Sequence, residues 1–97
     1  MDYQIIWSPQ SIEDINAIAQ YIARDSIVYA DSTVECIFKE TNRLTTFPKL
    51  GRIVPEKNKE SIREIFVFQY RIIYEILTSQ INIITVVHGK RIIENLI

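Results

Sequence analysis

The chain has little of several things on which small proteins often depend. Its 97 residues include one cysteine, one histidine and two glycines. A single cysteine, Cys36, cannot form an internal disulfide, and one histidine without a Cys-x-x-Cys pair does not favour a protein-built metal site. Two separate glycines, Gly51 and Gly89, cannot form a glycine-rich phosphate-binding loop. We therefore predict that the protein carries no metal and no cofactor.

The chain also lacks a long apolar run. No stretch is long enough to cross a bilayer, and the first residues have neither the basic nor the apolar region of a signal peptide. Together with the single cysteine, this predicts a cytoplasmic protein without a membrane partner. Hydrophobic residues make up 47% of the chain, which is enough for the core of one small domain covering residues 1–97.

The two halves of the chain differ in charge, although the net charge is only −1. Three basic and seven acidic residues give residues 1–48 a net charge of −4. Eight basic and five acidic residues give residues 49–97 a net charge of +3. A mildly basic half points weakly toward an acidic partner. On charge alone, we prefer the interpretation that this is an ordinary solvated surface.

Hydrophobic spacing predicts a strand followed by two helices in the first half. Residues 3–7 are β-prone, and Ser8 followed by Pro9 is typical of a helix start. Apolar residues at helical spacing predict a first helix over residues 9–24 and a second over residues 27–47, which ends before a proline. Because the connection is short, the two helices should form an antiparallel hairpin.

The second half predicts a long loop and then a series of antiparallel strands. Turn residues and polar residues fill positions 48–61, and strands are expected over about 62–68, 70–77 and 81–88. The order of elements is β-α-α-β-β-β. Helices grouped ahead of a run of strands predict an α+β fold, in which the helical hairpin packs on a small, mostly antiparallel sheet.

One predicted strand, centred on Tyr70-Arg71-Ile72-Ile73-Tyr74, carries an arginine among apolar residues. Alternation places Arg71 on one side of the strand and the two tyrosines on the other. Because an unpaired buried charge is costly, Arg71 should pair with Glu64 or Glu75. Five aromatic side chains are expected in the core: Tyr3, Trp7, Phe66, Phe68 and Tyr74.

Seven short motifs, taken in order, resemble one family. They are Ser8-Pro9, Tyr21-Ile22-Ala23, Pro48-Lys49-Leu50-Gly51-Arg52, Val54-Pro55-Glu56, Ile62-Arg63-Glu64, Tyr70-Arg71-Ile72-Ile73-Tyr74 and His88-Gly89-Lys90-Arg91. Together they resemble the RelE/ParE superfamily of toxins from type II toxin–antitoxin modules, often described as plasmid-stabilisation proteins. The resemblance covers nearly the whole chain and implies the same fold. It also implies a cognate antitoxin as partner and hetero-oligomers with it.

The resemblance implies one of two activities for the free toxin. ParE-like members poison DNA gyrase, whereas RelE-like members cut messenger RNA in the ribosomal A site. Cleavage of RNA without a metal needs cations around the phosphate and a group that transfers a proton. For that reaction the resemblance implies Arg71 and Arg91, with His88 or Arg63 assisting. For binding of the target, it implies five basic residues: Arg52, Arg63, Arg71, Lys90 and Arg91.

Three features favour the ParE-like branch. The strand before the Tyr-Arg motif offers only Arg63, and the neighbouring Glu64 would repel a phosphate. No tyrosine or histidine follows Arg91, and His88 precedes the glycine. We therefore predict a gyrase-binding toxin that is not an enzyme, with a RelE-like, ribosome-dependent endoribonuclease as the alternative. A relative that binds the antitoxin without being toxic is the third hypothesis.

Overall fold

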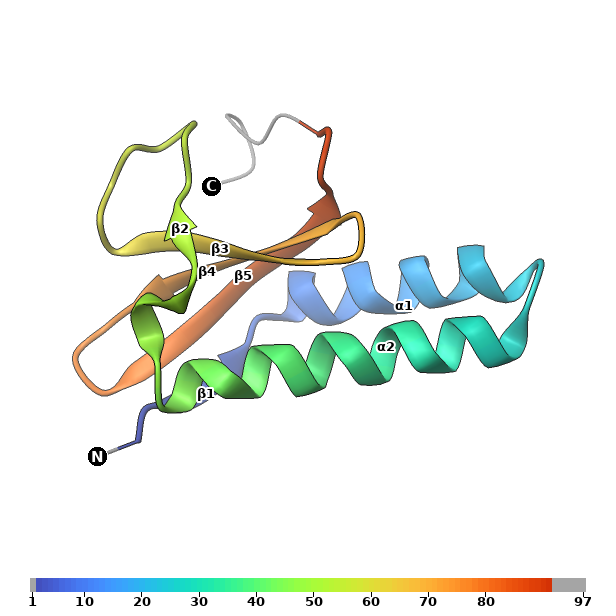
Figure 1. Ribbon diagram of the computed structural model, residues 1–97, viewed down its shortest axis with the longest axis horizontal. Coiled ribbons are helices and arrows are strands. Elements are labelled where there is room, and N and C mark those ends of the chain that lie inside the picture. The colour runs from blue at the N-terminus through green and yellow to red at the C-terminus, as the bar shows by residue number, and fades with distance from the viewer. Residues whose placement is uncertain (1, 92–97) are drawn as a thin grey trace.

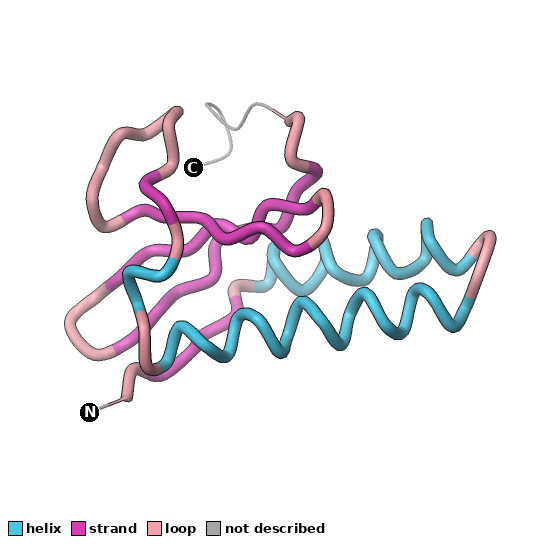
Figure 2. Tube along the Cα trace, in the orientation of Figure 1, coloured by secondary structure: helices cyan, strands magenta, loops and turns pink. Residues whose placement is uncertain are grey.

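A helical hairpin packs on one face of a five-stranded sheet in the computed structural model, which describes residues 2–91 (Figure 1, Figure 2). The strands lie in the order β1-β5-β4-β3-β2, with β1 parallel to β5 and all other neighbours antiparallel. The predicted α+β fold is confirmed, with one further strand. The elements follow the chain as β1 (Gln4–Trp7), α1 (Pro9–Ala23), α2 (Ile27–Asn42), β2 (Arg52–Ile53), β3 (Ile62–Val67), β4 (Tyr70–Ile76) and β5 (Gln80–His88).

Each helix begins where a serine caps it. The hydroxyl of Ser8 accepts a hydrogen bond from the Ser11 N–H (3.0 Å), and the hydroxyl of Ser26 accepts one from the Tyr29 N–H (3.1 Å). These bonds satisfy amide groups that have no partner within the helix. Within residues 2–91, neither helix is long and apolar enough to span a membrane.

The second helix ends earlier than its hydrophobic pattern predicts. α2 stops at Asn42 rather than at residue 47, and a 3₁₀ turn follows over Arg43–Thr45. The carbonyl of Thr45 accepts a hydrogen bond from the Tyr3 N–H (2.8 Å). The chain at the helix end is therefore tied to the segment that leads into β1, where its carbonyl groups find partners outside the helix.

The segment predicted as a loop over residues 48–61 contains structure of its own. It begins with a 3₁₀ turn at Pro48–Leu50 and continues into β2, which pairs with β3 over two residues. Gly51 lies between them, and a Cβ atom at this position would lie 2.4 Å from the Glu64 carbonyl oxygen. Only glycine allows the chain to approach β3 this closely.

The two faces of the sheet differ in what covers them. The face toward the helices carries the main core, in which Ile72 and Tyr74 of β4 are fully buried. The opposite face carries a smaller apolar cluster that includes Ile73 and Val54. Arg71 and Ile73 are two residues apart on β4. Because side chains alternate along a strand, Arg71 lies on this second face as well, opposite Phe66 of β3. The predicted alternation of β4 is therefore confirmed.

Two of the aromatic residues expected in the core are exposed. The exposed fraction is 49% for Phe66 and 59% for Phe68, whereas Tyr74 is fully buried. Phe66 lies on the face away from the helices. Phe68 lies in the two-residue turn between β3 and β4, where its φ angle is +55°. The prediction was wrong for these two residues. Alternation alone does not tell which face of the sheet Phe66 occupies, and Phe68 belongs to the turn rather than to a strand.

Candidate functional site

Arg71 is the centre of a buried ion-pair network on the face away from the helices. Its Nε donates to Oε1 of Glu64 (2.5 Å), which comes from the neighbouring strand β3. Its two terminal nitrogens donate to the two carboxylate oxygens of Glu56 (2.8 and 2.9 Å). Nη1 also donates to the carbonyl oxygen of Arg91 (3.0 Å). The guanidinium therefore joins β3, the loop after β2 and the chain after β5.

Glu64 connects this arginine to a second one. Its other oxygen, Oε2, accepts a hydrogen bond from Nε of Arg52 (2.6 Å). The Glu64 side chain is fully buried, whereas that of Arg52 is 60% exposed and lies over the ring of Phe66, 5.3 Å from its centroid. With Glu56 included, two arginines face two carboxylates. Among the described residues of this network, the charges of the two arginines are balanced by those of the two carboxylates, which weakens the field of these four groups at a distance.

The environment of Arg71 keeps it charged. The hydrogen bonds to Glu56 raise the pKa of Arg71 above its ordinary value, burial opposes this, and Glu64 raises the pKa further. Such a guanidinium does not release a proton in the physiological range, so it cannot serve as a general acid. Its side chain is 5% exposed. What it can do is hold the two carboxylates, and with them the loop, against the sheet.

Arg63 lies on the opposite side of the sheet from Arg71. It pairs with Tyr74 across β3 and β4, and residues opposite each other on neighbouring strands share a face. Its Nη1 donates to the Gly51 carbonyl (2.9 Å) and its Nε to the Glu60 carbonyl (3.0 Å). These bonds join the residue before β2 to the end of the loop before β3, and they leave Arg63 apart from the network around Arg71.

The remaining predicted site residues lie at the end of β5. His88, Lys90 and Arg91 are exposed, and Nδ1 of His88 accepts a hydrogen bond from the Lys90 N–H (3.2 Å). His88 pairs with Tyr70, so its side chain is directed to the helix side of the sheet. Arg71 is on the other side, and it bonds to the backbone carbonyl of Arg91 rather than to the Arg91 side chain. Arg63, Arg71, His88 and Arg91 therefore do not converge on one point.

The polar contacts of two residues in this region were not predicted from the sequence. Glu56 holds Arg71 through two hydrogen bonds, and the hydroxyl of Tyr74 links two parts of the preceding segment. That hydroxyl donates to the Pro48 carbonyl (2.7 Å) and accepts from the Gly51 N–H (3.0 Å). Burial is the main reason that the pKa of Tyr74 is raised. The sequence placed both residues in motifs of the family and predicted that Tyr74 is buried, but it did not predict these hydrogen bonds.

The described residues offer few means of binding a metal. Within residues 2–91, no group of three histidine, cysteine, aspartate or glutamate side chains is arranged to hold a metal ion. Cys36 on α2 is a partly buried free thiol. The chemistry of this region is therefore that of paired charges and exposed basic side chains.

Known structures share this fold over almost the whole chain. The chromosomal ParDE toxin–antitoxin system from P. aeruginosa contains a chain that is 15% identical, with 91% of this chain and 97% of that chain covered and a TM-score of 0.75. A mutant of the E. coli toxin RelE in the free state is 13% identical, with coverage of 93% and 86% and a TM-score of 0.68. The toxin–antitoxin complex RelBE2 from Mycobacterium tuberculosis contains a chain that is 17% identical, with 91% of this chain and 99% of that chain covered and a TM-score of 0.61. The fold is thus that of RelE and ParE toxins.

The family itself follows from the sequence. Residues 5–93 match the model of the ParE toxin of the type II toxin–antitoxin system parDE. No curated protein matches the chain. Because the match covers most of the chain, this protein belongs to the family of ParE toxins of type II toxin–antitoxin systems.

Proposed function

We propose that this protein inhibits growth from within the cytoplasm by binding DNA gyrase, and that a cognate antitoxin neutralises it. The observation that supports this target over RNA is the closed network around Arg71. The guanidinium that the resemblance assigns to a phosphate already binds two carboxylates and is 5% exposed. A phosphate would have to displace one of these carboxylates, and it would meet the negative charge of the other.

The other predicted residues offer a surface for binding rather than a catalytic centre. Arg63 is held by two backbone carbonyls, and on the other face Arg71 is enclosed. The side chains of Lys90 and Arg91 are exposed and supply positive charge at the end of β5, and the paired side chain of Arg52 is also 60% exposed. Exposed basic side chains of this kind attract an acidic protein surface and increase the rate of association.

A supercoiling assay with purified gyrase tests the proposed target. We expect the wild-type toxin to block supercoiling, and Arg91→Glu to weaken the block because it reverses one charge of the exposed basic surface. Lys39→Glu is the matched control, since it makes the same charge change on the exposed side of α2. Supercoiling that is indifferent to the wild-type toxin would contradict the proposal.

The ribonuclease alternative rests on the exposed residues after β5. His88 and Arg91 are accessible, so a proton-transfer group and a cation are present at one end of the sheet. Primer extension on translated messages after induction distinguishes the two activities. Cuts in the ribosomal A site that disappear in His88→Ala would favour the ribonuclease, whereas growth arrest with uncut messages favours gyrase.

The proposed antitoxin partner has support from the related structures. Two of them are named as toxin–antitoxin assemblies, the ParDE system and the RelBE2 complex. We expect a small protein encoded beside this chain to co-purify with it and to restore growth when both are expressed. Growth that is unaffected by the toxin alone would instead identify a non-toxic relative that has kept only antitoxin binding.

A further inference from the structure

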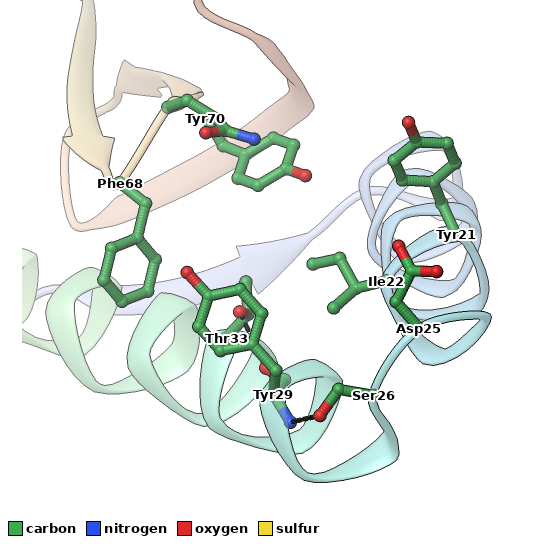
Figure 3. Close-up of a pocket in the computed structure, with 9 residues that line it drawn as sticks. Tyr21, Ile22, Asp25, Ser26, Tyr29, Thr33, Phe68 and Tyr70 are labelled. Atoms are coloured by element: carbon green, nitrogen blue, oxygen red, sulfur yellow. Dashed lines mark hydrogen bonds between the residues drawn. The ribbon is translucent and has the colours of Figure 1, made fainter.

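The end of the helical hairpin at which α1 connects to α2 forms a pocket with the turn between β3 and β4. Its volume is about 200 Å³. Figure 3 shows side chains from α2 and the turn on one side of the opening and side chains from the end of α1 on the other. Four aromatic rings line the pocket together with one carboxylate: Tyr21, Tyr29, Phe68, Tyr70 and Asp25. None of these residues belongs to the Arg71 network.

Most of these rings are exposed to a degree that folding alone does not explain. The exposed fraction is 67% for Tyr21, 56% for Tyr29 and 59% for Phe68, and the neighbouring Ile27 and Val28 are 70% and 77% exposed. Single exposed apolar residues are ordinary, but a contiguous group on a small protein marks an interaction surface. The pocket lies within that group, so it has the character of a binding site.

Phe68 is held in a conformation that its side chain disfavours. Its φ angle is +55° in the two-residue turn, a region that glycine enters easily and a bulky residue rarely adopts. Glycine would relieve this strain. Backbone strain of this kind is concentrated at functional sites. The turn therefore keeps an exposed ring over the pocket at the expense of its own stability.

Asp25 gives the pocket a negative charge at its rim on the α1 side (Figure 3). Its carboxylate makes neither a hydrogen bond nor an ion pair with any residue in the described part of the chain. An aromatic-lined pocket with a carboxylate at its edge is suited to a cation, because the ring faces and the carboxylate both attract positive charge. An apolar occupant alone would leave the carboxylate without a partner.

We propose that this pocket receives an arginine or lysine side chain of the antitoxin. This inference rests on the proposed antitoxin partner and names the residue type that the partner contributes here. A cavity of about 150 Å³ holds benzene, and the flat guanidinium end of an arginine is of similar size. The N-terminal half of the chain, which supplies most of the pocket, carries a net charge of −4 from three basic and seven acidic residues. That charge favours a basic segment over a second copy of this chain.

The surroundings provide a path for the rest of the antitoxin segment. A second cavity of about 420 Å³ shares Tyr21, Gln69 and Tyr70 with the pocket and runs beside α1 to Arg91. A chain that places its cation beside Asp25 can therefore continue past Tyr21 into this second cavity along α1. Ile27 and Val28, at the start of α2, lie in the sequence between the pocket residues Ser26 and Tyr29, and their exposed side chains offer further apolar surface.

Neutralising Asp25 tests the charge recognition. The complex of toxin and antitoxin is prepared with wild-type toxin, with Asp25→Asn and with the control Asp31→Asn, and the dissociation constants are measured by calorimetry at low and high salt. Asp31 is an exposed carboxylate of α2 that does not line the pocket. We expect Asp25→Asn to weaken binding by roughly 3- to 30-fold and to reduce the salt dependence, as for a cation held by rings and a carboxylate. Asp31→Asn should leave both unchanged.

Replacing Phe68 separates binding from folding. Phe68→Gly removes the ring and relieves the positive φ, so the urea midpoint of the free toxin should stay equal or rise while affinity for the antitoxin falls. A ring with a purely structural role would lower both. The occupant is then identified by replacing arginines of the antitoxin with glutamine. The replacement that weakens binding to the wild-type toxin but not to Asp25→Asn marks the arginine that enters the pocket.

The outcomes that overturn the inference are distinct from those that overturn the partner. An intact complex whose affinity is unchanged in both Asp25→Asn and Phe68→Gly overturns the cation pocket and leaves the antitoxin partner in place. A wild-type toxin that binds no antitoxin overturns the partner and this inference together. A toxin dimer that Asp25→Asn or Phe68→Gly dissociates shows that a second copy occupies the pocket, and it also overturns the inference.

Discussion

The two faces of the sheet are stabilised in different ways. The face under the helices is filled by apolar side chains, among which Ile72, Ile81 and Ile83 are fully buried. The opposite face buries Arg71 and Glu64, which are joined by a hydrogen bond of 2.5 Å. Apolar burial is spread over many contacts, whereas an ion-pair network concentrates its effect in a few atoms. Single polar substitutions on the second face should therefore have the larger effect.

The largest effect is expected from Glu64→Gln. This change leaves the buried Arg71 with one carboxylate and removes the ion pair of Arg52. Breaking a buried pair on one side costs about 3–5 kcal/mol of unfolding free energy, a large part of the total for a small domain. Urea denaturation measures it. Glu60→Gln is the control, because Glu60 pairs with Lys49 at the surface and should cost at most about 1 kcal/mol.

An equal loss of unfolding free energy for the two substitutions would contradict the proposed difference between buried and exposed ion pairs. It would mean that water enters the network and weakens its charges as it does at the surface. Amide exchange of the strand residues around Arg71 then provides a second measurement, since a solvated network should open locally well below the global unfolding free energy.

The face under the helices also contains polar contacts, and one of them involves Tyr74. Tyr74→Phe removes the hydroxyl that bonds to the Pro48 carbonyl and the Gly51 N–H. Leaving buried backbone groups without partners costs about 1–3 kcal/mol, so we expect a loss of that size in urea denaturation. Tyr70→Phe is the control, because the Tyr70 hydroxyl has no hydrogen bond with any residue the structure describes. A similar loss in both variants would show that the ring rather than the hydroxyl is responsible.

The sequence predicts the local features of both faces better than the contacts that reach them from loops. Helix starts and the alternation of β4 depend on neighbouring residues, so caps and spacing predict them. The sequence predicts that Arg71 pairs with Glu64 or Glu75, and the structure shows the pair with Glu64 on the adjacent strand. Glu56 was not predicted because it reaches Arg71 from a loop whose path depends on the whole fold.

Register explains most of the remaining differences. Arg63 and His88 were grouped with Arg71, but the cross-strand pairs place them on the other side of the sheet. A shift of one residue moves a side chain to the opposite face, and no local signal sets the register here. The turn at Phe68 carries neither glycine nor asparagine, which are the usual signs of such a turn. β2 is only two residues long and has no periodic pattern to detect.

A smaller effect of opposite sign is expected within the helix-covered core. Thr41 is fully buried in α2, and its hydroxyl has no hydrogen-bond partner among residues 2–91. An unsatisfied buried hydroxyl costs about 1–3 kcal/mol, so the nearly isosteric Thr41→Val should raise the unfolding free energy by about 1 kcal/mol. Thr33→Val serves as the control because the Thr33 hydroxyl bonds to the Tyr29 carbonyl. A gain in stability from both variants would point to general apolar burial instead.

The smallest effect appears only in alkaline solution. Burial raises the pKa of Tyr74 above its ordinary value of 10.0, although the Gly51 N–H and Arg63 oppose the shift. The folded protein therefore keeps this proton at a pH where the unfolded chain has lost it. The contribution of neutral Tyr74 to the unfolding free energy is complete below the pKa of the unfolded chain, and it is lost as the pH rises through the higher pKa of the folded state. The unfolding free energy falls by at most about 1.4 kcal/mol per pH unit in this range. Urea midpoints between about pH 9 and pH 11 should fall more steeply for the wild type than for Tyr74→Phe. The exposed tyrosines are common to both proteins and cancel, so parallel curves would contradict a buried, neutral Tyr74.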